Sequence, residues 1–107
     1  MTGSFGELGS LLKQAQQMQR DLDRVREELR QKTVEGSAGG GAVKVLVTGD
    51  RQVTKVEIAA ELLSKPDKQM LEDLLLAALR DGISKATRLS NESLGRVTGG
   101  ISLPGLF

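Results

Sequence analysis

Basic and amide side chains recur at helical spacing in two parts of this 107-residue chain. Residues three or four positions apart share one side of an α-helix, so each set would form a stripe. The first stripe consists of Lys13, Gln17, Arg20 and Arg24. The second consists of Arg80, Ser84 and Arg88, with Lys85 beside them. Arginine and lysine suit phosphate groups, although a charge stripe is more often only a solvated helix face.

No comparable pattern indicates catalysis. Ser10 and Lys13 have the Ser-x-x-Lys spacing of some acyl enzymes, but the companion motifs of those enzymes are missing. The glycines at 39–41 are not followed by the Gly-Lys-Ser/Thr of a phosphate loop. Adjacent Glu72 and Asp73 suit a helix start, where carboxylates are favoured by the helix dipole. Because the chain has no histidine and no cysteine, we expect no enzyme, no metal site and no cofactor.

The net charge of the chain limits the kinds of partner that it could bind. Fifteen basic and fourteen acidic side chains leave a net charge of +1. A polyanion such as DNA would therefore meet a local basic patch rather than a basic protein. The densest apolar stretch, residues 71–79, is interrupted by two carboxylates and is too short to span a bilayer. We expect a soluble, cytoplasmic protein without a membrane partner or a small-molecule substrate.

A seven-residue repeat predicts the element that carries the first stripe. Its apolar positions, separated by alternating threes and fours, are Leu8, Leu11, Ala15, Met18, Leu22, Val25 and Leu29. This seam predicts a helix over residues 9–31, with Ser10 as its N-cap and a frayed segment at 1–7. The seam must pack on the second helix of the chain or on a second copy.

Alternating valines predict an antiparallel hairpin with strands at 43–48 and 53–58 and a turn at 49–52. Residues 33–36 begin the β-rich section, and residues 37–42 are expected to form a flexible loop. One register satisfies both an apolar face and a charge pair. Its pairs are Thr48–Val53, Val45–Val56, Val43–Ile58 and Lys44–Glu57.

A second amphipathic pattern predicts a helix that carries the second basic stripe. It begins between Ser64 and Asp67, whose spacing resembles a capping box, and continues to about Ser93. Gly95 is expected to be its C-cap. The fold class is therefore α+β, with a long N-terminal helix, a small antiparallel sheet of about three strands and a second long helix. We expect one domain at 1–94 and a flexible tail at 95–107.

Four segments, in this order, resemble the YbaB/EbfC family of nucleoid-associated DNA-binding proteins from bacteria. They are LLKQAQQMQ (11–19), GAVKV (41–45) leading through Gly49 to VEI (56–58), MLEDLLLAA (70–78) and TGGISLPGL (98–106). The resemblance implies a homodimer whose strands join across the two-fold axis. It also implies long helices that project like the arms of tweezers around a gap near the width of a DNA duplex.

The resemblance further implies DNA binding with weak or variable sequence preference, and roles in nucleoid organisation and gene regulation. Family members bind DNA through the helices at both ends of the chain. The residues here that match this role by charge and helix face are Lys13, Arg20, Arg24, Arg80, Lys85 and Arg88. The alternative hypothesis is a coiled-coil-like dimeric protein-interaction module that does not bind DNA, which the near-zero net charge favours.

Overall fold

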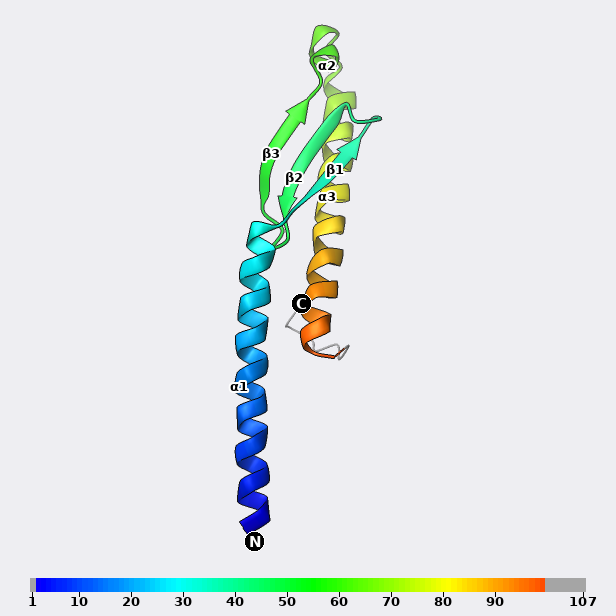
Figure 1. Ribbon diagram of the computed structural model, residues 1–107. Coiled ribbons are helices and arrows are strands. Elements are labelled where there is room, and N and C mark those ends of the chain that lie inside the picture. The colour runs from blue at the N-terminus through cyan, green and yellow to red at the C-terminus, as the bar shows by residue number, and fades with distance from the viewer. Residues whose placement is uncertain (1, 100–107) are drawn as a thin grey trace.

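The computed structural model describes the backbone of residues 2–99 and the side chains of residues 6–99. One long helix packs on a face of a three-stranded antiparallel sheet, and the other extends away from the end of the sheet (Figure 1). The elements are α1 (Thr2–Gln31), β1 (Thr33–Ala38), β2 (Val43–Thr48), β3 (Val53–Ile58), α2 (Ala60–Ser64) and α3 (Lys68–Val97). The predicted α+β class is confirmed. The short α2 was not predicted.

Helix α1 begins at Thr2, so the predicted frayed segment and the N-cap at Ser10 are wrong. The segment contains no proline, and Gly6 and Gly9 keep ordinary negative φ values. Each glycine costs a helix only about 1 kcal/mol relative to alanine. A free-energy cost of this size is too small to end the helix at either glycine.

Helix α3 begins at Lys68, one residue after the predicted range, and its cap is Asp67 and not Ser64. The Asp67 carboxylate accepts a hydrogen bond of 3.1 Å from the Met70 N–H. Ser64 instead ends α2, where its hydroxyl donates to the Glu61 carbonyl at 2.8 Å. Pro66 separates the two helices because it lacks the N–H that a continuous helix needs.

The end of α3 differs from the prediction. The helix continues through Gly95 to Val97, and Thr98 is its C-cap, with its N–H 3.2 Å from the Leu94 carbonyl oxygen. Gly99 follows with a φ of 67°, the left-handed conformation that commonly terminates helices. The predicted tail at 95–107 is thus helical in its first three residues, and its residues 100–107 lie outside the described part.

The sheet has the strand order β1-β2-β3. The predicted pairs Val43–Ile58, Lys44–Glu57 and Val45–Val56 are confirmed. The predicted Thr48–Val53 pair is wrong: Val53 lies opposite Val47, because the register shifts between Leu46 and Val47. This bulge lets the Thr48 N–H donate to the Gln52 carbonyl at 2.9 Å, which closes the turn.

Two smaller expectations about the strands also need correction. Ser37 and Ala38 belong to β1, so the predicted loop at 37–42 is reduced to a turn. Lys44 lies opposite Glu57, but the ion pair of Glu57 is formed with Lys55 on its own strand, at 2.8 Å. Side chains two residues apart share one face of a strand, which explains this choice.

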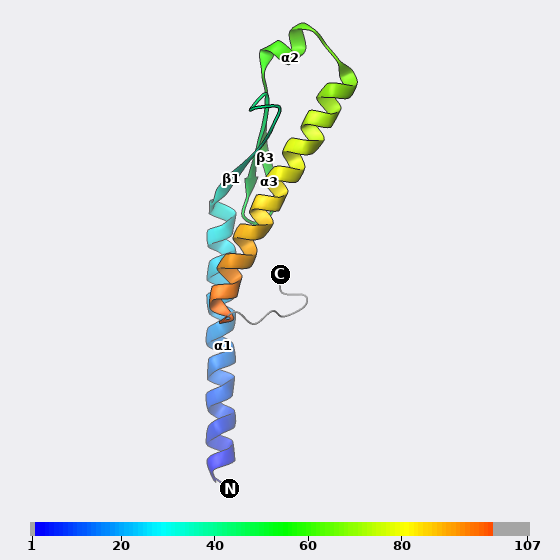
Figure 2. The same cartoon turned by 90° about the vertical axis from the view of Figure 1, so that its right-hand side faces the viewer.

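The core of the sheet lies between β2 and α3. Val43, Val45 and Val47 are almost completely buried and pack with Ala78 and Ala86 of α3. Helix α3 covers β1 and β2 (Figures 1 and 2). Apolar burial of this kind supplies most of the favourable free energy of folding.

Helix α3 crosses β1 at two glycines. A Cβ atom on Gly36 would lie 2.3 Å from the carbonyl oxygen of Ala78 and 2.4 Å from the backbone nitrogen of Gly82. No side chain fits into this crossing, so the two backbones lie directly against each other.

A second core cluster joins α1 to α3. It consists of Leu22, Val25 and Leu29 of α1 and Leu94 of α3, with Leu89 and Val97 at its edge. The expectation that the seam packs on the second helix is therefore confirmed for its C-terminal half. In the N-terminal half, Leu8, Leu11 and Met18 are exposed, and α1 extends past the end of α3 (Figures 1 and 2).

The result is an elongated molecule with extents of 78 × 21 × 16 Å. Among the described residues, no helix is both long enough and apolar enough to cross a membrane.

Candidate nucleic-acid interface

The basic stripe on α1 is exposed to solvent. Lys13 and Arg20 lie on the outer side of the helix, away from the seam that packs on α3, and Arg24 lies at the edge of that contact. Lys13 belongs to the part of α1 whose apolar residues have no partner, whereas Arg24 lies beside the α1–α3 contact. A helix fixes the spacing of these cations to about 5–6 Å per turn.

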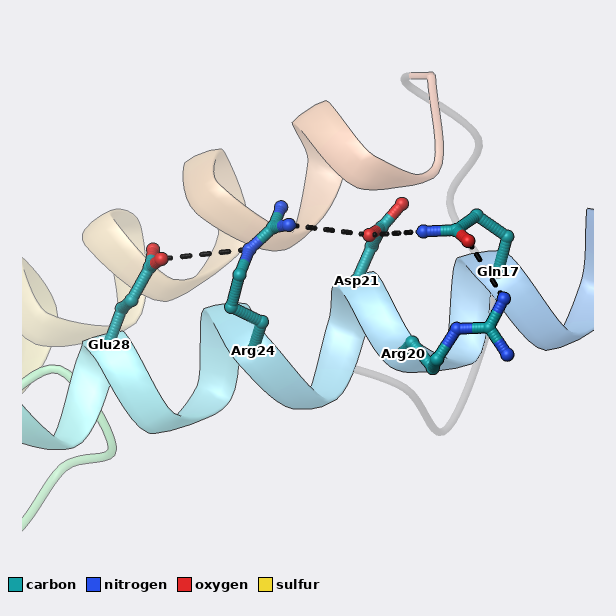
Figure 3. A network of polar contacts seen from close by, with 5 residues as sticks. All are labelled: Gln17, Arg20, Asp21, Arg24 and Glu28. Atoms are coloured by element: carbon teal, nitrogen blue, oxygen red, sulfur yellow. Dashed lines mark hydrogen bonds and ion pairs between the residues drawn. The ribbon is translucent and has the colours of Figure 1, made fainter.

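A polar network connects the stripe to acidic neighbours (Figure 3). The Arg20 guanidinium donates to the side-chain oxygen Oε1 of Gln17 at 2.8 Å, and the side-chain nitrogen Nε2 of Gln17 donates to the Asp21 carboxylate at 3.0 Å. Arg24 lies 3.4 Å from Asp21 and 3.7 Å from Glu28. The network therefore holds two cations and two anions, and its net charge is zero.

The same network borders a groove between α1 and α3. The groove has a volume of about 380 Å³ and exposes the basic groups of Arg24, Lys32 and Arg96 beside the carboxylates of Asp21 and Glu28. Arg96 was missed by the sequence analysis, because only the path of α3 brings it next to α1.

The basic stripe on α3 lies at the level of the sheet. Arg80 and Arg88 are exposed. Lys85 instead binds the edge strand: its Nζ donates to the Glu35 carbonyl of β1 at 3.0 Å and lies 3.1 Å from the Asp81 carboxylate. The Asp81 carboxylate also accepts the Ser37 N–H at 3.0 Å. Lys85 thus helps to hold β1 on α3.

These contacts perturb the titration of Asp81. The hydrogen bond from the Ser37 N–H, followed by that from Lys85, lowers the pKa of the Asp81 carboxyl below its ordinary value of 3.8. Both contacts favour the charged form of the carboxyl group. On β3, the hydrogen bond and charge of Lys55 likewise lower the pKa of Glu57.

The six predicted site residues do not form one continuous patch. Those on α1 lie beside and beyond the α1–α3 contact, and those on α3 lie along the sheet. The structure also reveals a third basic group, formed by Arg26, Arg30 and Arg51 where α1, α3 and the β2–β3 turn meet. The spacing of Arg26 and Arg30 is visible in the sequence, but the approach of Arg51 depends on tertiary structure.

Within the described part of the chain, no group of three or more histidine, cysteine, aspartate or glutamate side chains is arranged to hold a metal ion. The observed chemistry of the site is that of arginine, lysine and amide groups. Fold and surface together define a class: a small, elongated α+β protein with two long helices that expose cations suited to a polyanion.

Comparison with known proteins identifies the family. The model of the YbaB/EbfC DNA-binding family matches residues 5–101, and the chain belongs to this family. A nucleoid-associated protein of Acetivibrio thermocellus is 46% identical over 106 residues, covering 98% of this chain and 94% of the relative. A nucleoid-associated protein of Bacillus thuringiensis is 43% identical over 105 residues, with coverages of 98% and 96%.

A crystal structure has the same fold. An uncharacterized protein from Helicobacter pylori matches with a TM-score of 0.73 and 25% sequence identity, covering 89% of this chain and 97% of that protein. The family resemblance inferred from the sequence is thus confirmed, together with the fold class and the nucleoid-associated, DNA-binding character of the family.

Proposed function

We propose that the protein binds duplex DNA as a homodimer with weak or variable sequence preference, organises the nucleoid in the cytoplasm, and modulates gene expression. The observation that carries the proposal is the exposed stripe of Lys13, Arg20 and Arg24 on α1, of which Lys13 and Arg20 lie away from the packing surface and Arg24 borders the groove between α1 and α3. A rigid helix presents these cations at fixed intervals, as contact with a DNA backbone requires.

The acidic neighbours of the stripe do not prevent phosphate binding. Arg24 is paired with Asp21 and Glu28 through exposed contacts of 3.4 and 3.7 Å. Exposed ion pairs of this kind contribute only about 0.2–1 kcal/mol. Bidentate bonds between a guanidinium and a phosphate are stronger, so the arginine exchanges one partner for another at small cost.

The chemistry of the stripe also supports weak sequence preference. Contacts with phosphates fix the position of a protein on the duplex but carry no sequence information directly. The chain has only two aromatic residues, Phe5 and Phe107, and therefore few groups that could stack on bases. Any preference would come from the shape of the duplex.

Strand β3 supports the homodimer. It is an edge strand, and α3 covers β1 and β2. Val53 and Val56 of β3 consequently remain 43% and 45% exposed. An open edge next to an apolar face is a template for pairing with another strand. In the proposed dimer, the β3 strands of two copies lie together and cover these valines.

A DNA mobility shift tests the function. Wild type is titrated into a long duplex of mixed sequence at two salt concentrations, and binding should weaken steeply with salt. The double substitution Arg20→Glu and Arg24→Glu should abolish the shift, whereas Lys65→Glu with Lys68→Glu, an equal change of charge near the start of α3, should preserve it. Equal affinity of both variants contradicts the assigned stripe.

Light scattering tests the dimer. Val56→Lys places a charge on the face that the second copy would cover, at a position that is already half-exposed in one protomer. Wild type should have twice the mass of one chain, and the variant should have the mass of one folded chain. A dimeric variant would contradict an interface at β3.

One observation favours a second candidate, a module that binds another protein. Leu8, Leu11, Leu12 and Met18 form an exposed apolar surface on the free half of α1, and such surfaces are typical of protein contacts. Salt-insensitive capture of a protein partner by an intact dimer that does not shift DNA would support this alternative.

A further inference from the structure

The third basic group lines a small pocket that contains none of the six predicted site residues. The pocket has a volume of about 170 Å³ and lies where α1, α3 and the β2–β3 turn meet. Its polar lining consists of Arg26, Arg30, Asp50, Arg51 and Ser90. Pockets for drug-sized molecules measure roughly 300–1,000 Å³, so this one suits a single small group.

The β2–β3 turn is fixed to the end of α1. The Gly49 N–H lies 2.9 Å from the Leu29 carbonyl oxygen and 3.0 Å from that of Lys32. A Cβ atom at Gly49 would lie 2.7 Å from the same Leu29 oxygen, so only glycine allows this approach. The turn therefore holds Arg51 at a defined position beside the α1 arginines.

Arg51 has an unusual backbone conformation. Its φ of 66° makes it the one described non-glycine residue with a positive φ. The conformation is held by the Arg51 N–H, which donates to the Thr48 carbonyl at 2.9 Å, and by the Gln52 N–H, which donates to the Thr48 hydroxyl at 3.0 Å. Strain of this kind, which costs of order 1 kcal/mol, is concentrated at functional sites.

Among the three arginines that line the pocket, Arg51 is the one that has no acidic partner within the described residues. Arg26 is paired with Asp23 at 3.4 Å, and Arg30 is paired with Glu27, through exposed contacts with carboxylates outside the pocket lining. Within the described residues, no hydrogen bond or ion pair occupies the Arg51 side chain. The lining itself carries three cations against one anion, Asp50, whose carboxylate accepts the Thr48 hydroxyl.

We infer that this pocket binds one phosphate group of the DNA backbone, with Arg51 as its principal contact and Arg26 and Arg30 in support. The inference rests on the proposed function and adds a contact at the sheet end of α1. The buried Ser90 hydroxyl at the pocket lining is a further donor for an anionic oxygen. A planar guanidinium is the side chain best suited to two phosphate oxygens.

The test compares the DNA affinity of Arg51→Gln with that of Lys65→Gln across a salt series, using fluorescence anisotropy with a labelled duplex. Both variants lose one exposed cation, but Lys65 is remote from the pocket. Arg51→Gln should lower affinity by about fivefold to tenfold and reduce the salt slope by about one. Lys65→Gln should leave both quantities unchanged. Glutamine has the same backbone restriction as arginine, so the comparison isolates the charge.

Failure of the inference can be distinguished from failure of the proposed function. If wild type binds DNA and both variants bind as tightly as wild type, the phosphate pocket is refuted while DNA binding stands. If wild type does not bind at low salt, the proposed function fails and the pocket fails with it. The Arg51 Nε–H resonance of unaltered protein gives a second measurement. It should shift on addition of duplex, and a constant resonance at saturating DNA overturns the inference.

Discussion

At the residue scale, the carboxylates beside the basic stripe are as important as the arginines. Arg24 lies between Asp21 and Glu28 (Figure 3), and the network has no net charge. The sequence shows that acidic and basic residues alternate here, but it does not show which pairs form. Arg24 combines with residues on both sides because its long side chain reaches neighbours three and four positions away.

Removing these acids should strengthen DNA binding. The substitutions Asp21→Asn and Glu28→Gln keep the size of both side chains and remove two negative charges next to the arginines. Two unit charges about 4 Å apart in water interact by about 1 kcal/mol, which corresponds to about a fivefold change in affinity for each acid removed. Anisotropy at low salt measures the gain. Glu61→Gln, on α2, is the control, and equal affinities of the control and the double variant would contradict the electrostatic explanation.

The contacts of Asp81 should make stability depend on pH. The pKa of Asp81 is lowered in the folded state. Its contribution is therefore present above the ordinary carboxyl pKa and is lost as the pH falls through the lowered value. The difference in unfolding free energy between wild type and Asp81→Asn should be largest above about pH 5 and should shrink below about pH 4. Urea denaturation at several pH values measures this difference.

Asp73→Asn provides the matched control, since Asp73 is an exposed carboxylate on the same helix. A constant difference between wild type and Asp81→Asn from pH 7 to acid would show that the Ser37 and Lys85 contacts do not favour the charged carboxyl group.

At the element scale, the crossing of β1 over α3 defines how the sheet sits on its helix. Gly36 and Gly82 allow backbone contact, and Val45 and Val47 surround the same point. Gly82 interrupts an apolar helical pattern, so the sequence indicates a close approach or a bend at this point. It does not identify Gly36 as the partner, because the two residues are far apart along the chain.

Two glycine substitutions in α3 should have opposite effects. A Cβ atom at Gly82 would lie 2.7 Å from Cγ2 of Val47, whereas a Cβ atom at Gly95 meets nothing within 4 Å. Gly82→Ala should destabilise the fold by about 1–3 kcal/mol through overpacking. Gly95→Ala should stabilise it by about 1 kcal/mol through helix propensity. Thermal unfolding of both variants tests the crossing, and stabilisation by Gly82→Ala would refute it.

Replacing a leucine by alanine should change the unfolding free energy by different amounts in the two halves of α1. Leu29 is 2% exposed in the α1–α3 core, whereas Leu11 is 60% exposed. Leu29→Ala should cost about 2–5 kcal/mol of unfolding free energy. Leu11→Ala should change it by less than about 0.5 kcal/mol, as is usual at exposed sites. If Leu11→Ala costs as much as Leu29→Ala under conditions where the protein is one chain, the free half has an unrecognised partner.

The sequence predicted the elements of this fold well and their contacts less well. The seven-residue repeat correctly gave α1, and alternating valines correctly gave β2 and β3. Ends of elements were less predictable, since the bulge opposite Val47 and the cap at Thr98 depend on hydrogen bonds between backbone groups. The pocket around Arg51 was not predictable, because three separate elements build it.

At the scale of the whole molecule, the surface proposed for dimerisation and the surface proposed for DNA binding lie at different places. The apolar edge of β3 and the basic side of α1 do not overlap in one protomer. A dimer formed through β3 would therefore leave both α1 stripes open to DNA. Doubling the number of cations without covering any of them strengthens binding to a polyanion and steepens its dependence on salt.

The part of α1 that extends past α3 can pivot about the α1–α3 contact. The α1 residues that precede Leu22, the first residue of the α1–α3 core, form a helical segment roughly 30 Å long that is anchored at one end. A rotation of about 5° at the anchor moves the free end of this segment by roughly 3 Å. In a dimer, small rotations of the two α1 helices would change the distance between their N-terminal ends with little loss of packing. A single protein could thus close on duplexes of different width and curvature.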